Sequence, residues 1–284
     1  RYYENKYLIT KSDPKSDVFD RLIFARRDIE TSKVPSFIKY IGQYAFERCY
    51  NLQTIEFPEN SELEIIESNA FIKMNIEKIS IPKHVKYIGD NAFLCCYKLK
   101  EVVFSSDSEL EIIGCHAFSS TIIENISIPH CKKIDFCSFD KCYHLKTFEC
   151  KSGLEIIESS AFFDTSIESI TIPSSIIKFS NNWCERTNRL NQINVIKNEV
   201  ENVILYDNQL LIEKSDSQTN VFDRLIFAPR DIKTAIIPSS VTSIAPYAFE
   251  NCTQLLDVIF EKNSELTLVE YSSFQYSGIR SIII

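Results

Sequence analysis

The sequence of 284 residues is poor in the residues that nucleotide-binding and membrane-spanning segments require. Its five glycines are too few for glycine-rich phosphate-binding loops. No apolar run approaches the ~20 residues of a transmembrane helix, so no direct membrane insertion is expected. Acidic residues outnumber basic ones by 39 to 31, and the resulting net charge of −8 disfavours nucleic acid as a partner.

Signatures of catalysis are also missing. The sequence contains no G-x-S-x-G, H-E-x-x-H or phosphate-binding glycine motif. Cysteine and histidine gather within residues 115–150, but without the C-x-x-C or H-x-x-x-H pairs of zinc sites. We therefore predict that the chain is not an enzyme, and we assign it no catalytic residue, no metal ligand and no cofactor.

What the sequence has in quantity is isoleucine, with 41 residues. Isoleucine is β-branched and favours strands. The hydrophobic fraction of 44% is typical of a globular protein and excludes wholesale disorder. The chain also lacks an initiating methionine and a signal peptide, and we expect it to be a fragment of a longer protein.

An internal repeat organises the sequence. An Ala-Phe or Ser-Phe pair recurs every 21 to 25 residues within each run, and a strand-like pattern follows each pair. Nine units of 22–24 residues result, with Trp183 in the phenylalanine position of unit 173–196. The phenylalanines of the other units are Phe46, Phe71, Phe93, Phe118, Phe139, Phe162, Phe249 and Phe274.

A second period of 203 residues relates Val18–Ala25 to the identical segment Val221–Ala228. Each copy contains two strand-like runs, for example Val203–Ile212 and Phe222–Phe227, with a polar loop between them. This pattern predicts a β-hairpin. The expected organisation is a hairpin insertion at 1–34, seven repeats at 35–196, a second hairpin at 197–237, and two further, truncated repeats at 238–284.

The repeat resembles the BspA-type leucine-rich repeat, with the pattern L-x-x-I-x-I-P-x-x-V-x-x-I-G-x-x-A-F-x-x-C. Unit 82–104 matches it at Pro82, Val85, Ile88, Gly89, Ala92, Phe93, Cys96, Leu99, Val102 and Phe104. The resemblance implies a repeat solenoid with a parallel β-sheet on the concave face and short helical or irregular convex segments. It also implies a surface protein of bacteria or parasitic protists that binds other molecules.

Stacking of the repeats buries the apolar face that one unit cannot bury alone. The last predicted strand, 279–284, then presents an open apolar edge. Either further repeats follow it, or the fragment associates with itself end to end.

Position in the repeat argues that most of the ten cysteines are unpaired. Four lie three residues after the repeat phenylalanine in alternate units, about 10 Å apart if turns stack at ~4.8 Å, which is too far for disulfides. We predict that Cys49, Cys96, Cys142 and Cys252, together with Cys150, are buried thiols. One local disulfide between two of the remaining cysteines is still an alternative; these are Cys95, Cys115, Cys131, Cys137 and Cys184.

The candidate binding surface is the concave strand face. Its outward positions are mostly small and polar, without a basic stripe, and favour a protein or glycan partner. The predicted binding residues are Glu56, Ser80, Val103, Ser127, Glu149, Thr171, Asn194 and Ile259. The hairpins are a second candidate surface. Two N-x-[ST] triplets make Asn125 and Asn251 candidate glycosylation sites of a secreted protein.

The resemblance implies a non-enzymatic adhesion protein at the cell surface or secreted, which recognises proteins or glycans of another cell or of the matrix. The alternative is a cytoplasmic scaffold for protein interactions, because unpaired thiols are typical of a reducing compartment.

Overall fold

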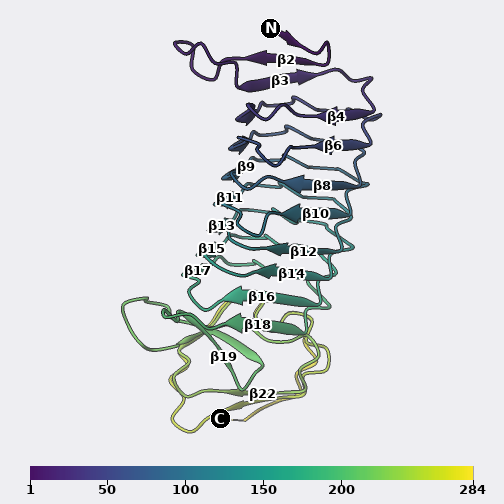
Figure 1. Cartoon of the computed structure of the whole chain (residues 1–284). Coiled ribbons are helices and arrows are strands. Elements are labelled where there is room, and N and C mark those ends of the chain that lie inside the picture. Colours follow the sequence, from purple (N-terminus) through teal and green to yellow (C-terminus); the bar gives the residue numbers. More distant parts are fainter. Residues whose placement is uncertain (284) are drawn as a thin grey trace.

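The computed structural model describes residues 1–283, which form an elongated β-solenoid with the termini at opposite ends (Figure 1). Each turn of the solenoid carries a longer strand, a two-residue strand and a pair of tight turns. No helix occurs within the described residues. The structure confirms the predicted repeat solenoid, and of the two options for the segments opposite the long strands, irregular turns rather than helices are observed.

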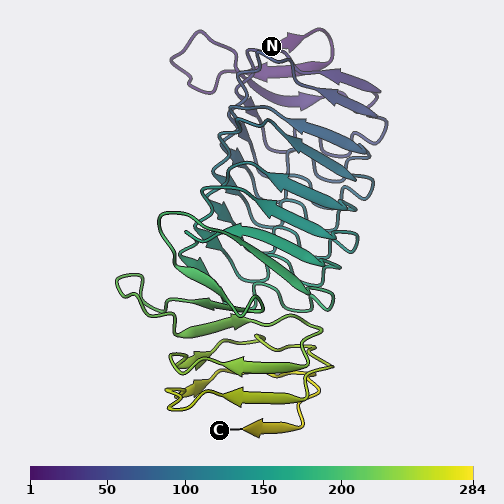
Figure 2. The same ribbon diagram turned by 60° about the horizontal axis from the view of Figure 1, so that its bottom comes forward.

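Eleven longer strands stack along one side of the solenoid and make its long-strand face (Figure 2). Adjacent long strands pair in parallel and form four separate ladders. In one of them, Ile79 is paired with Val102. The strands are β4 (Thr31–Lys33), β6 (Thr54–Glu56), β8 (Lys78–Ile81), β10 (Glu101–Phe104), β12 (Asn125–Ile128), β14 (Thr147–Cys150), β16 (Ser169–Pro173), β18 (Gln192–Ile196), β22 (Thr234–Ile237), β24 (Asp257–Phe260) and β26 (Ser281–Ile283). Two of them, β4 and β22, lie inside segments 1–34 and 197–237.

A second series of parallel strands, which the sequence analysis did not predict, runs along another side of the solenoid in two ladders. Two residues per turn are too few to show a period-2 pattern in the sequence. In most of these strands the second residue is buried, for example Ile66 and Ile88. The strands are β5 (Tyr40–Ile41), β7 (Ile65–Ile66), β9 (Tyr87–Ile88), β11 (Ile112–Ile113), β13 (Lys133–Ile134), β15 (Ile156–Ile157), β17 (Lys178–Phe179), β23 (Ser243–Ile244) and β25 (Leu268–Val269). One ladder runs up to β17, and the other contains β23 and β25.

The repeat phenylalanines from Phe46 to Phe162 form a continuous ladder in the core, and Phe249 and Phe274 form a separate pair. Phe71, Phe93 and Phe118 are fully buried, and their ring centroids lie 5.0 and 5.1 Å apart in stacked orientation. Stacked aromatic pairs at 4.5–7 Å contribute stability beyond the area that they bury.

The prediction that Trp183 holds the phenylalanine position of its repeat is wrong by one residue. The amide of Phe162 donates to the Trp183 carbonyl (3.1 Å) as that of Phe93 donates to the Ala117 carbonyl, so Trp183 takes the alanine position and Cys184 the phenylalanine position. The Trp183 ring still packs edge-on against Phe162, with centroids 6.4 Å apart.

Backbone hydrogen bonds connect successive turns on the side of the solenoid that carries the phenylalanines. The amide of Phe93 donates to the carbonyl of Ala117 in the next turn (2.7 Å), and the amide of Cys95 donates to Ser119 (3.0 Å). Residues two before and two after the phenylalanine have positive φ, as Asn91 (56°) and Cys95 (59°) do. The left-handed conformation turns the chain tightly enough for the next turn to stack in register.

The predicted hairpins contain one strand more than expected. The run 203–212, predicted as one strand, is two antiparallel strands, β19 (Val203–Tyr206) and β20 (Leu210–Glu213). Asp207 and Asn208 both have positive φ, which two-residue hairpin turns require. A longer loop then leads from β20 to β21 (Arg224–Phe227), which pairs in parallel with β23.

The first copy repeats this arrangement at the N-terminal end. The strands β1 (Tyr2–Tyr3), β2 (Tyr7–Thr10) and β3 (Arg21–Ala25) are antiparallel, and β3 pairs in parallel with β5. The loops between β2 and β3 and between β20 and β21 project from the solenoid (Figure 2).

The cysteines agree with the thiol interpretation. All ten are free, and the five predicted core thiols are fully buried. The Sγ atoms of Cys96 and Cys142 each donate to the carbonyl of the phenylalanine in the preceding turn, at 3.1 Å. Burial raises the pKa of the Cys96 thiol to about 12. The local disulfide that the sequence analysis left open is not formed.

The C-terminal end of the solenoid exposes apolar side chains. Within the described residues, β26 pairs only with β24, and Ile282 and Ile283 are 60% and 50% exposed. The predicted strand 279–284 therefore begins two residues later, at Ser281, and its last residue, Ile284, lies outside the described residues.

Candidate functional site

The alternation of the long strands places the predicted binding residues on the outer surface. In β8, β10 and β12 the side chains alternate between exposed and buried positions. Glu56, Ser80, Val103 and Ser127 are exposed. The predicted residues Glu149, Thr171, Asn194 and Ile259 lie on the same outward register and are partly exposed.

The strand register aligns these residues along the solenoid axis. Ser80 is matched with Val103. In the longest ladder, Ser127, Glu149, Thr171 and Asn194 are matched in turn. The structure thus brings residues that are 22 to 23 positions apart in sequence into one row.

Side chains in the middle of this row bond to one another. Ser127 Oγ donates to Glu149 Oε2 (2.6 Å), and Asn194 Nδ2 donates to Thr171 Oγ1 (3.2 Å). Their hydrogen-bonding capacity is therefore partly used within the face, which leaves this section less able to take a ligand.

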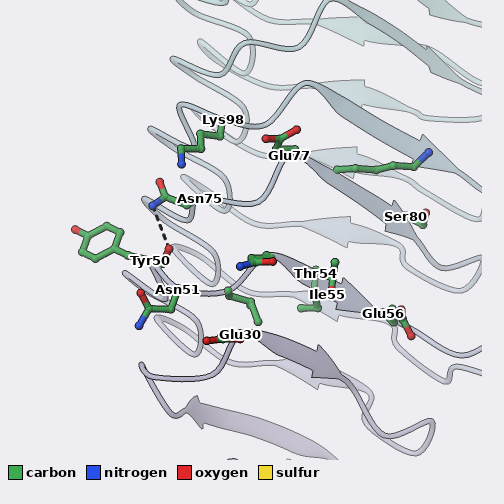
Figure 3. A pocket seen from close by; sticks show the side chains of 13 residues that line it. Glu30, Tyr50, Asn51, Thr54, Ile55, Glu56, Asn75, Glu77, Ser80 and Lys98 are labelled. Carbon is green, nitrogen blue, oxygen red and sulfur yellow. Dashed lines mark hydrogen bonds between the residues drawn. The ribbon is translucent and has the colours of Figure 1, made fainter.

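A groove of about 810 Å³ opens at the N-terminal part of the same face, where the chain enters β6 and β8 (Figure 3). The predicted residues Glu56 and Ser80 line one side of it, and Tyr50, Asn75 and Lys98 line the other. Hydroxyl, amide, carboxylate and ammonium groups therefore surround a space open to solvent.

Charges along this groove belong to both signs and are partly paired. Lys78 Nζ lies 2.7 Å from Glu101 Oε1, and Lys100 Nζ lies 3.3 Å from Glu77 Oε2. Such exposed pairs add little stability. Because they balance the local charge, the groove has no excess of positive charge to attract a phosphate.

Sequence reasoning missed the turn residues of the groove because it considered only the outward positions of strands. Tyr50 is 53% exposed, and Asn75 Nδ2 donates to its carbonyl oxygen (3.1 Å). A signal was present in the sequence, since tyrosine follows the repeat cysteine in three alternate units. All three tyrosines, Tyr50, Tyr97 and Tyr143, are more than half exposed.

The two candidate glycosylation sites differ in their surroundings. Asn125 is exposed in β12, and its Oδ1 accepts a bond from Thr147 Oγ1 (2.7 Å). Asn251 is partly buried, and its Nδ2, the atom to which a glycan would be attached, donates to Asn188 Oδ1 (2.7 Å). Asn125 is thus the more accessible of the two candidates.

A solved structure with a high TM-score shares this fold. A leucine-rich cell surface protein from Faecalibacterium prausnitzii superimposes with a TM-score of 0.76 at 21% identity, over 100% of this chain and 76% of that one. The pneumococcal vaccine antigen PcpA (TM-score 0.46, 20% identity, 97% of this chain and 54% of that one) and a leucine-rich-repeat protein from Bacteroides ovatus (0.48, 18%, 99% and 90%) are more distant. No curated protein matches the sequence.

Within residues 1–283, no helix has the length and apolar character that crossing a bilayer requires.

The sequence profile of the BspA-type leucine-rich repeat region matches in six copies, over residues 19–142, 111–207 and 208–284. Leucine-rich-repeat solenoids are extended surfaces that generally serve protein interaction. With nearly its whole length matched, the chain belongs to the BspA-type leucine-rich-repeat family.

Proposed function

We propose that this protein is a non-enzymatic cell-surface adhesion protein that binds a protein or glycan of another cell or of the matrix. Its ligand lies along the long-strand face and is held chiefly in the groove between Tyr50 and Ser80. The observation that carries the proposal is the groove itself, a space of about 810 Å³ on the face where solenoids bind.

The groups in the groove suit such a ligand. Exposed tyrosine offers a rigid apolar surface with a polar end, which is why tyrosine is frequent at binding interfaces. The amides of Asn51 and Asn75 and the hydroxyl of Ser80 offer both donors and acceptors to peptide or sugar groups. The surface location is supported by the family and by the description of the Faecalibacterium relative as a cell surface protein.

Antibody labelling of intact, non-permeabilised cells of the source organism tests the location. Surface staining is the expected result. Staining only after permeabilisation would contradict the adhesion role. It would favour the alternative of a cytoplasmic scaffold, which the ten free thiols also suit.

Binding of the whole chain to immobilised matrix proteins and to a glycan array tests the face. Ser80→Arg places a long charged side chain in the groove and is expected to weaken binding at least tenfold. Ile177→Arg adds the same side chain at another exposed position, outside the groove. Equal loss in both variants, or no loss in Ser80→Arg, would place the ligand elsewhere, with the hairpin loops as the next surface to test.

We also propose that chains associate end to end, because the two hairpin copies differ in one respect. Ile226 and Phe227 of the second copy are 2% and 0% exposed, whereas their counterparts Ile23 and Phe24 are 36% and 37% exposed. Phe227 is covered by the preceding repeat, with Trp183 at 6.1 Å. Within residues 1–283, no repeat covers the face that carries Phe24, and the last turn of a second chain would supply an equivalent cover.

A further inference from the structure

Three side chains with metal-binding atoms meet on the turn side of the solenoid. His116, Cys137 and Asp140 each offer one such atom, and all three atoms lie within 4.8 Å of one another. His116 Nδ1 is 4.0 Å from Asp140 Oδ2. Histidine and cysteine are the commonest zinc ligands, and aspartate also occurs.

Stacking of two turns creates this cluster, and its backbone is rigidly held. His116 and Cys137 occupy the same position in consecutive turns, two residues before Phe118 and Phe139, and both have positive φ (52° and 54°). The amide of His116 donates to the Phe136 carbonyl (3.0 Å), and the amide of Asp140 donates to the Cys137 carbonyl (3.0 Å). Cys137 and Asp140 are three residues apart, the spacing of a C-x-x-C zinc pair.

One atom of the cluster lacks the partner that its burial requires. Asp140 is only 7% exposed, and its Oδ1 has no hydrogen-bond partner among the described residues. Its Oδ2 accepts a bond from Ser119 Oγ (3.3 Å), and Lys141 Nζ lies 3.8 Å away. A buried carboxylate oxygen left unpaired is costly, and a bound cation would remove this cost.

We propose that His116, Cys137 and Asp140 bind a Zn²⁺ ion, with water as the fourth ligand. Zinc lies about 2.0–2.3 Å from such ligands, which places the ligand atoms of a tetrahedral site about 3.5 Å apart. The present separations, which are at most 4.8 Å, need to shorten by about 1.3 Å or less, and side-chain rotation can supply this. The imidazole of His116 is 36% exposed, so the ion and its water can enter from solvent. Lys141, whose side chain is 48% exposed, can turn away into solvent.

Zinc binding at this site must displace a proton. A cysteine thiol is mostly protonated at neutral pH, because its ordinary pKa is about 8.5. Zinc binds the thiolate, so the ion has to release the thiol proton at neutral pH. Affinity should therefore rise with pH, and each ion bound should release about one proton.

The test is titration of the full chain, freed of metal by chelator, with Co²⁺ in place of zinc and then with Zn²⁺ in competition. One equivalent of Co²⁺ should bind with the visible absorption of a tetrahedral thiolate complex. His116→Ala and Cys137→Ser should each lower the affinity about 100-fold or more, since even loss of a partner behind a ligand costs 10–100-fold.

Matched controls are His144→Ala, which removes an exposed histidine, and Cys95→Ser, which removes a partly exposed thiol outside the cluster. Both should bind Co²⁺ as the parent chain does, and circular dichroism checks that every variant is folded. The proposal is overturned if the folded parent chain binds no ion, or if His116→Ala and Cys137→Ser bind as tightly as the controls.

Discussion

At the scale of single residues, stability depends on side chains that repeat in the same position from turn to turn. Phe93 stacks on Phe71 from the turn before and on Phe118 from the turn after, so its truncation removes contacts with two neighbours. Three residues later lies a second buried position, filled by Cys96 or Cys142 in alternate units and by Thr121 between them. These side chains reach a carbonyl or a thiol of a neighbouring turn, which satisfies polar groups inside the core.

Phe93→Ala should lower the free energy of unfolding by about 3–5 kcal/mol, because it leaves a cavity between Phe71 and Phe118. Urea denaturation followed by circular dichroism measures the loss. Tyr97→Ala, at an aromatic residue that is 63% exposed, should change stability by only about 0.5 kcal/mol. Equal losses in the two variants would show that the phenylalanine ladder is not the core element described above.

Alkaline pH should destabilise the fold through the buried thiols. Burial raises the pKa of Cys96 from 9.0 to about 12 and that of Cys142 to about 11. The unfolded chain releases these protons first, so the stabilising effect of burying the neutral thiols is complete below pH 9 and is lost as pH rises from 9 to 12. Each thiol should contribute about 1.4 kcal/mol per pH unit between pH 9 and its own raised pKa, which is about 12 for Cys96 and about 11 for Cys142.

Measuring the free energy of unfolding against pH tests this, with Cys96→Ala as the comparison. The variant should lose one thiol's share of the slope above pH 9. If the slope is unchanged in Cys96→Ala, the alkaline loss has another origin.

At the scale of elements, the two hairpin copies show how position changes the role of one sequence. Arg21 and Arg224 are equivalent, and they bond to the equivalent carboxylates Glu67 (2.7 Å) and Glu270 (3.0 Å). Only Arg224 has a second ionic partner, Glu213, at 2.5 Å. The first copy has Thr10 in place of Glu213, and its Arg21 side chain is 37% exposed against 17% for Arg224.

Arg224→Ala should therefore cost about 3–5 kcal/mol, because the buried Glu213 loses its counter-ion. Arg21→Ala should cost about 1 kcal/mol or less, as exposed ion pairs do. Fluorescence of Trp183, the single tryptophan, which contacts the second hairpin, follows unfolding of this region in urea. A cost for Arg21→Ala as large as that for Arg224→Ala would contradict this assignment.

At the scale of the described solenoid, which is one-dimensional, the first and last turns expose Phe24 and Ile282, whereas the equivalent Phe227 and Val258 of inner turns are buried. Inside the chain, the second hairpin packs on the repeat before it, with Arg230 buried and its Nη2 bonded to Cys184 Sγ (3.6 Å). The N-terminal hairpin and the C-terminal turn each have one half of such a contact. Stacking of chains in this head-to-tail manner does not close and would give short filaments.

Light scattering at rising protein concentration should then show association of the chain, and Phe24→Asp should reduce it by placing a charge on the open hairpin face. Tyr97→Asp, at an exposed position on the side of the solenoid, should leave association unchanged. A monomer at high concentration in the parent chain would rule out the end-to-end contact.

The repeat pattern by itself determined the architecture. Each turn contains its own core residues, and the spacing of Ala-Phe pairs gives the length of each turn and therefore which residues of successive turns stack. The parallel long strands, the phenylalanine ladder and the buried cysteines followed from that spacing. The division into segments 1–34, 35–196, 197–237 and 238–284 and the binding role of single residues stay predictions.

Contacts between turns were decided only by the tertiary structure, since they join residues about 22 positions apart whose side-chain directions depend on local backbone conformation. The two-residue strands such as β9 are too short to show a periodic pattern. The turn at Asp207 and Asn208 interrupts a run that is otherwise strand-like. The groove at Tyr50 and the meeting of His116 with Cys137 arise when turns stack, because stacking places equivalent positions of successive repeats side by side.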